Sequence, residues 1–107
     1  MRKTLTKQEV INILRNELPY LKKKYGVEKV AIFGSFAKDK QNSRSDVDIL
    51  VQLSKPLGLD FIELGYRLED VLGRKIDLTT FDCLERGKEI PRYKHIAVDV
   101  EGTLIYV

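Results

Sequence analysis

The sequence has very few of the side chains that form disulfides and many metal centres. Its 107 residues include one cysteine, Cys83, and one histidine, His95. A single cysteine excludes a disulfide within the chain and suits the reducing cytoplasm, where we expect the protein to act. One residue of each kind is also too few for a zinc site built from cysteine and histidine. We expect Cys83 to be a small buried side chain and His95 to lie on a polar helical surface.

Long apolar runs and a strong excess of one charge are also missing. No apolar run approaches the roughly 18 residues of a membrane span, and the polar start of the chain does not resemble a secretory signal. Lys and Arg total 19 against 16 Asp and Glu, so the net charge of +3 does not indicate a dedicated nucleic-acid binder. With 43% hydrophobic residues, the length predicts a single domain over residues 1–107.

Apolar spacing and turn residues predict helices that alternate with strands, and therefore an α/β (α+β) layer structure. Thr6 to Glu9 is a capping box that begins a first helix, Pro19 should kink this helix or divide it in two, and Gly26 should end it. Segment 82–88 is ambiguous. The predicted strands are Val27–Phe33, Val47–Leu53, Lys75–Thr79 and Thr103–Val107, and the later predicted helices are Phe61–Leu72 and a segment from near Pro91 to Gly102.

Two carboxylates stand two residues apart at the start of the second predicted strand. Side chains at this spacing share one face of a strand, so Asp46 and Asp48 should project together, away from the apolar face of segment 47–51. Like charges this close raise each other's pKa unless a cation lies between them. Their oxygen atoms suit Mg²⁺ or Mn²⁺, with a substrate phosphate as a further ligand. The pair alone is common by chance, and two solvated carboxylates are the alternative.

A Gly-Ser pair upstream makes a binding site the better interpretation. Gly34 and Ser35 end the first predicted strand, and ten residues separate Ser35 from Asp46. A glycine at this point lets the backbone approach a ligand closely. The residues that follow can open a short helix, whose N–H groups and Ser35 hydroxyl could receive phosphate oxygens. A simple strand-to-turn break is the commoner meaning of Gly-Ser by itself.

A third carboxylate, Asp77, lies in the short strand predicted after the second long helix. Ile76 and Leu78 should face the core, and Asp77 should therefore face the opposite side. If this strand pairs beside the one that carries Asp48, the three carboxylates can meet. An isolated Asp in a short strand is more often a surface residue, but a shared site explains a central carboxylate better.

Together, Gly34-Ser35, the ten-residue spacing, Asp46-x-Asp48 and the later Asp77 resemble the minimal nucleotidyltransferases of the DNA polymerase β-like superfamily. The capped first helix, the strand leading into Gly34 and the helix between the two Asp-bearing strands follow the same order, so the resemblance covers essentially the whole chain. One departure is Lys38-Asp39, where the family commonly has Arg-Gly. This difference could alter the loop or its phosphate contacts, but it changes none of the carboxylates.

The resemblance implies a nucleotidyltransferase fold, a small mixed sheet flanked by helices, that binds ATP and two Mg²⁺ or Mn²⁺ ions. Gly34 and Ser35 would hold the β- and γ-phosphates. Asp46 and Asp48 would ligate the metals, and Asp77 would bind one metal and help to deprotonate the attacking hydroxyl. Two such metals can stabilise the attacking and leaving oxygens of an in-line displacement. Attack at the α-phosphorus would transfer a nucleotidyl group and release pyrophosphate.

The resemblance also implies a partner, because larger relatives carry a second domain for the acceptor. Short members of the family resemble the antitoxin half of toxin–antitoxin pairs, whose partner is an all-helical HEPN-type ribonuclease. In such pairs the nucleotidyltransferase is similar to an enzyme that adenylylates a tyrosine of the toxin.

Other functions remain open from the sequence alone. An antitoxin that occludes its partner without catalysis would be expected to carry a degraded motif, whereas all three Asp residues are present. A small-molecule nucleotidyltransferase is disfavoured by the short chain, and an RNA-binding domain rests only on scattered lysines.

Overall fold

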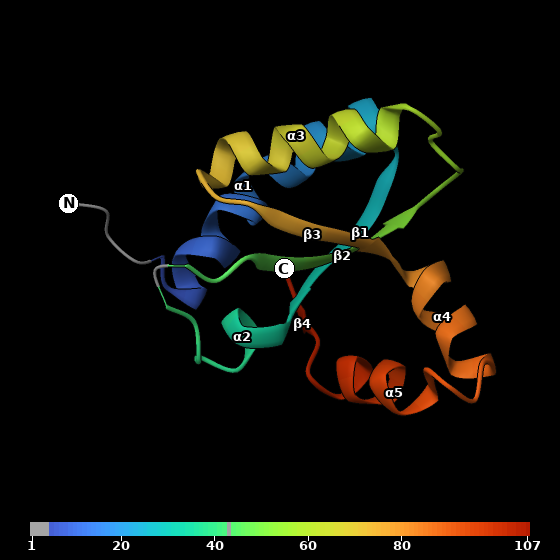
Figure 1. Ribbon diagram of the computed structural model, residues 1–107. Coiled ribbons are helices and arrows are strands. Elements are labelled where there is room, and N and C mark those ends of the chain that lie inside the picture. Colours follow the sequence, from blue (N-terminus) through green and yellow to red (C-terminus); the bar gives the residue numbers. More distant parts are fainter. Residues whose placement is uncertain (1–4, 43) are drawn as a thin grey trace.

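A mixed sheet forms the centre of the protein, whose structure, a computed structural model, describes residues 5–42 and 44–107. In the described part of the chain the sheet has four strands in the order β3-β2-β1-β4 (Figure 1). β1 is antiparallel to both β2 and β4, and β3 is parallel to β2. The strand bounds are β1 Val27–Phe33, β2 Val47–Leu53, β3 Ile76–Thr80 and β4 Ile105–Tyr106.

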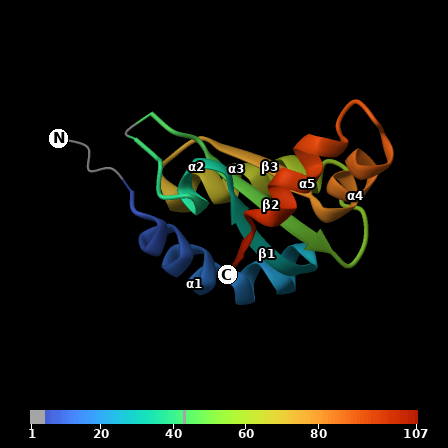
Figure 2. The same cartoon turned by 90° about the horizontal axis from the view of Figure 1, so that it is seen from below.

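Helices cover both faces of this sheet. α1 and α3 lie together on one face, and α4 and α5 lie on the other (Figures 1 and 2). The short α2 directly follows β1. No helix of the described residues is long and apolar enough to cross a membrane. The helix bounds are α1 Lys7–Tyr25, α2 Gly34–Ala37, α3 Asp60–Leu72, α4 Phe81–Glu89 and α5 Lys94–Gly102.

The two faces of the sheet carry cores of very different size. Between the sheet and α1 and α3 lies an extensive cluster that includes Leu14, Leu21, Leu64 and Leu68, all fully buried. On the α4 and α5 face, the buried cluster consists of four residues of the described chain, which are Ala31, Leu50, Leu84 and Ala97. Since the burial of apolar area is the dominant favourable term in folding, the core beneath α1 and α3 contributes most of the folding stability.

The alternation of side chains along β2 decides where the carboxylates lie. Val47, Ile49 and Val51 are fully buried in the larger core. Asp48 and Leu50 point to the opposite face, because successive strand residues alternate, and Leu50 belongs to the smaller core beneath α4 and α5. The large core therefore anchors β2 from one side and leaves its carboxylate face available on the other.

Most predicted elements are confirmed, and the differences concentrate in the last third of the chain. The strands over 27–33 and 47–53 have the predicted bounds, and the third strand begins one residue later than expected. The ambiguous segment 82–88 lies within α4. The final helix begins at Lys94, three residues after Pro91, because residues 91–93 form a turn first. The last strand is confined to Ile105 and Tyr106.

The ends of α1 are as predicted, but its interior is not divided. The Thr6 hydroxyl accepts a hydrogen bond from the Glu9 N–H at 3.1 Å, and Gly26 caps the other end with φ +69°. Pro19 lies within one continuous helix. It lies on the exposed side, where water can solvate the carbonyl that lacks an N–H partner, so the expected division is wrong.

One side-chain prediction is also wrong and a second is confirmed. Cys83 is exposed rather than buried. It occupies the first turn of α4, where the next residue, Leu84, takes the position that faces the core. His95 is exposed in the first turn of α5, as expected.

Candidate functional site

The site centres on Asp48, because the sheet places this residue between two other functional positions. In the antiparallel β1–β2 pair Asp48 lies opposite Phe33, the residue that directly precedes Gly34. In the parallel β2–β3 pair it lies opposite Asp77. The expected pairing of the two Asp-bearing strands is thus confirmed, in the register that brings their carboxylates to the same face.

Position 34 requires glycine for two reasons: its backbone conformation, and the close approach of the Asp48 side chain. Its φ is +71°, in the left-handed region that side chains other than glycine rarely adopt. A Cβ at this position would lie 2.0 Å from Oδ2 of Asp48. The Asp48 carboxylate therefore occupies the space that a side chain at position 34 would need. Since α2 begins at Gly34, the start of this helix lies directly against the carboxylate.

The electrostatics of the site follow from this crowding. The pKa of Asp48 is raised from its ordinary 3.8 to about 6, first because the carboxyl is half-buried and then by the negative charges of Asp77 and Asp46. Asp77 is exposed on β3, and Asp46 is exposed just before β2 begins. Of the three carboxylates predicted to act together, Asp46 and Asp77 therefore both lie close enough to Asp48 to disfavour its ionisation.

These carboxylates fit a hard divalent cation in chemistry but do not enclose one. Clustered carboxylate oxygens that repel one another suit Mg²⁺ or Mn²⁺, whose charge would relieve the repulsion. Among residues 5–42 and 44–107, no group of three or more His, Cys, Asp or Glu side chains is arranged to hold an ion by itself. Further ligands would have to come from a bound substrate, as is usual for Mg²⁺ at phosphate sites.

Residues 35–40 are held in place by specific contacts, although the sequence departs from the family pattern at residues 38 and 39. Asp39 adopts φ +56°, a left-handed conformation that Asp tolerates better than most residues and that glycine adopts without cost. Its carboxylate pairs with Lys7 of α1 at 2.9 Å. The half-buried Ser35 accepts at its carbonyl from the Lys40 N–H at 2.9 Å. Asp39 therefore adopts the turn conformation that a glycine would adopt more easily, and its ion pair with Lys7 holds it there.

Arg74 is a contributor to this region that sequence reasoning missed. Its guanidinium donates to the carbonyl of Ser45 at 2.8 Å and to that of Asn42 at 3.5 Å. Because Ser45 directly precedes Asp46, Arg74 fixes the approach of the chain to the first carboxylate. No spacing pattern links Arg74 to residues 42–45, and only the folded structure brings them together.

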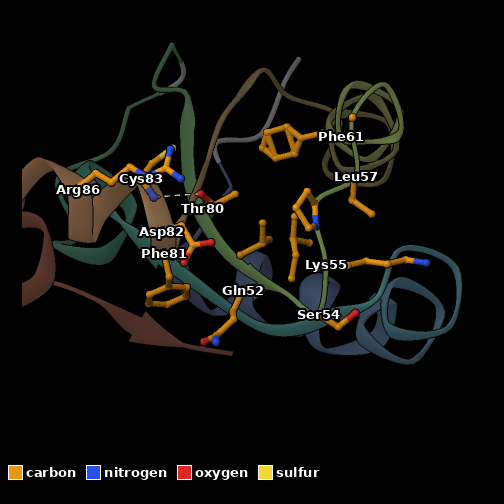
Figure 3. Close-up of a pocket in the computed structure, with 14 residues that line it drawn as sticks. Gln52, Ser54, Lys55, Leu57, Phe61, Thr80, Phe81, Asp82, Cys83 and Arg86 are labelled. Carbon is orange, nitrogen blue, oxygen red and sulfur yellow. Dashed lines mark hydrogen bonds between the residues drawn. The ribbon is translucent and has the colours of Figure 1, made fainter.

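A cavity of about 440 Å³ lies away from the carboxylates, at the far end of β2 (Figure 3). It is bounded by the 54–58 loop, by Phe61 of α3 and by the first turn of α4, where the Cys83 N–H donates to the Thr80 hydroxyl at 3.2 Å. At about 3.3 Å per residue, this end of β2 is roughly 16 Å from Asp48. We therefore place the candidate site at the carboxylates and not in this cavity.

Comparison with known proteins shows to which family the chain belongs. Residues 14–104 match the family model described as the nucleotidyltransferase domain. The chain belongs to this nucleotidyltransferase family. A relative from Methanocaldococcus jannaschii, named as a candidate protein adenylyltransferase, is 38% identical over 103 residues, which cover 95% of this chain and 98% of the relative. The protein adenylyltransferase MntA of Thermococcus cleftensis is 38% identical over 84 residues, covering 78% and 85% of the two chains.

Solved structures share the fold. A toxin–antitoxin structure with AMP-PNP superposes with a TM-score of 0.51 at 27% identity, over 71% of this chain and 57% of that chain. A variant of the toxin–antitoxin complex MntA–HpeT superposes with a TM-score of 0.60 at 20% identity, over 97% and 72% of the two chains. The second match covers nearly the whole of this chain and shows that the fold is shared.

We predict that Asp48→Asn stabilises the metal-free protein above pH 6 and has no such effect near pH 3. The pKa of Asp48 is raised from 3.8 to about 6 in the folded protein, so the cost of its charge to the fold grows as the pH rises between these values and is complete above about pH 6. Near pH 3 the carboxyl is largely neutral in both the folded and the unfolded state. Allowing for solvent screening at a half-buried site, the gain should be about 1 kcal/mol. Urea unfolding in EDTA at pH 3 and pH 7.5 measures it. A gain that is equal at both pH values would contradict the repulsion.

We predict that Gly34→Ala displaces the Asp48 carboxylate, whereas Gly58→Ala does not. Both glycines have a positive φ, but nothing lies within 4 Å of a Cβ at Gly58. Each variant should therefore lose about 1 kcal/mol from backbone strain. In Gly34→Ala, Asp48 must also rotate away, so its pKa should fall back toward its ordinary value. Carboxyl NMR titration measures this pKa, and an unchanged Asp48 titration in Gly34→Ala would refute the close approach.

Proposed function

We propose that this protein is a Mg²⁺-dependent protein adenylyltransferase that transfers AMP from ATP to a tyrosine of a helical HEPN-type toxin, and so acts as an antitoxin. The observation that carries the proposal is the register that places Asp48 beside Asp77 and against Gly34. Membership of the nucleotidyltransferase family and the names of the adenylyltransferase relatives support the reaction. The AMP-PNP-bound toxin–antitoxin neighbour supports the nucleotide and the partner. Because ATP is the donor, we place the reaction in the cytoplasm.

Each side chain then has a role. Gly34 and Ser35 hold the β- and γ-phosphates, since α2 begins where the backbone can approach a ligand. Asp46 and Asp48 hold two Mg²⁺ ions, which Mn²⁺ can replace, and Asp77 contributes to one of them. Bound Mg²⁺ would neutralise charge on the triphosphate and on the leaving pyrophosphate.

The transfer itself is a single displacement at the α-phosphorus. The tyrosine hydroxyl oxygen forms a bond to this phosphorus as the bond to the bridging oxygen breaks, and pyrophosphate leaves with that electron pair. Asp77 takes the hydroxyl proton. The exposure of Asp77 at the edge strand β3 suits this role, because an acceptor on another protein must reach it.

The direct test combines the protein with Mg²⁺, ATP and a HEPN-type toxin, for which a small helical protein encoded by a neighbouring gene would be the first choice. Intact mass spectrometry should show one or more AMP groups added to the partner, and none when Asp46 and Asp48 are both replaced by Asn. The double variant should remain folded, because the change removes repelling charges. Partner inhibition without an AMP adduct would favour an antitoxin that acts by binding alone. Adenylylation of small hydroxyl compounds but not of the partner would favour a small-molecule enzyme.

We predict that Asp77→Asn separates nucleotide binding from transfer. Asn keeps the shape and one oxygen ligand but cannot accept a proton at neutral pH, and general-base assistance is typically worth about 10²–10⁴-fold in rate. Single-turnover transfer should fall by about this factor, while calorimetry should still detect Mg-ATP binding. Loss of ATP binding as complete as in the Asp46 and Asp48 double variant would make Asp77 simply a third metal ligand.

A further inference from the structure

We infer that the apolar cavity between the sheet and the α4–α5 pair is the acceptor subsite, which receives the tyrosine of the partner protein together with its flanking apolar residues. The inference rests on the proposed function and adds to it the place where the acceptor binds. The cavity measures about 440 Å³ and reaches Asp77. It lies on the same face of the sheet as the carboxylates, opposite the large core.

The lining of this cavity suits an aromatic ring. Its inner wall includes Leu50 of β2 and Leu84 of α4, which are buried, and Phe33 at the end of β1. Within the described chain, Asp77 and Arg86 are the charged residues of the lining. Ligand sites are typically apolar concavities of about 300–1,000 Å³ with a few polar groups that orient the ligand. A tyrosine ring in such a pocket could present its hydroxyl toward Asp77.

The order of the strands indicates which side of the site the acceptor must use. Gly34 and Ser35 follow β1, Asp48 lies on β2, and Asp77 lies on the edge strand β3. In an in-line displacement the attacking and leaving oxygens lie on opposite sides of the phosphorus. With the β- and γ-phosphates at Gly34 and Ser35, the hydroxyl must approach from the β3 side. The cavity reaches that side, because Asp77 and Thr79 of β3 are part of its lining.

The rim of the cavity favours a protein over a nucleobase as the occupant. Ile90, Tyr93 and Ile96 line it, yet they remain 45%, 46% and 52% exposed. A base would fill the interior and leave these side chains in water, whereas a protein segment would cover both the interior and the rim. The α3 surface also exposes Ile62, at 57%, but it lies beyond the sheet, where a bound partner could not present a hydroxyl to Asp77.

The test uses two variants of one helix. Ile96 lines the cavity and Val98 does not, although both are in α5 and both are 52% exposed. Ile96→Gln and Val98→Gln add no charge near the carboxylates. We expect Ile96→Gln to raise the Kd for the helical partner, and the partner concentration that half-saturates AMP transfer, by about tenfold, which is a typical loss for an interface anchor. Mg-ATP affinity should stay within about twofold of wild type, and Val98→Gln should match wild type throughout.

The outcomes separate this inference from the proposed function. If ATP affinity falls in Ile96→Gln, the cavity holds the nucleobase and the inference is wrong. An equal loss of partner affinity in both variants would place the partner on the outer surface of α5 instead. If the wild type binds the partner but adds no AMP, the proposed function fails and the cavity is not an acceptor subsite, while the Kd of Ile96→Gln for the partner still shows whether the partner binds in the cavity. If the wild type does not bind the partner at all, both fail.

Discussion

The arrangement of the site depends on the repulsion among three carboxylates around Asp48. The fold holds this half-buried side chain between Asp77 and Asp46, although its pKa shows that ionisation there is disfavoured. The stability that tolerates this arrangement comes from the other face of the same strand, where Val47, Ile49 and Val51 are fully buried. One strand thus joins a large apolar core to a cluster of like charges, and the alternation of its side chains keeps the two apart.

Several parts of this arrangement could be predicted from the sequence because they depend on local patterns. The capping box at Thr6, the β-branched strands and the alternation along 47–51 are properties of neighbouring residues, and they gave the correct elements. The place of Asp77 followed once its strand was expected to pair beside the one that carries Asp48, and the register confirms that pairing. The functional roles of these residues remain proposals.

Other parts could not be predicted, because they depend on contacts between distant segments. Leu84 is the buried side chain of α4, so the helix has too few apolar positions to show a helical period in the sequence. This explains why segment 82–88 is ambiguous from the sequence and why the expectation of a buried Cys83 is wrong. Arg74 reaches the carbonyls of Asn42 and Ser45 only after β3 has docked beside β2. Asp39 adopts a positive φ, a conformation that a sequence usually reveals by a glycine, and no glycine stands at this position. The ion pair between Asp39 and Lys7 joins segments that are far apart in the chain.

The unequal cores on the two faces of the sheet also divide the protein into parts of different local stability. Segments with few buried apolar contacts open at a lower free-energy cost than the rest of a fold, and they do so as cooperative units. The α4–α5 pair, attached through a small buried cluster, is such a unit, whereas β1 and β2 are anchored by the larger core. Under the proposed function, substitutions in α4 and α5 would therefore change which acceptor this face binds, while β1 and β2 keep Gly34 and Asp48 in place. Over evolutionary time, such a protein could change its partner without rebuilding its catalytic carboxylates.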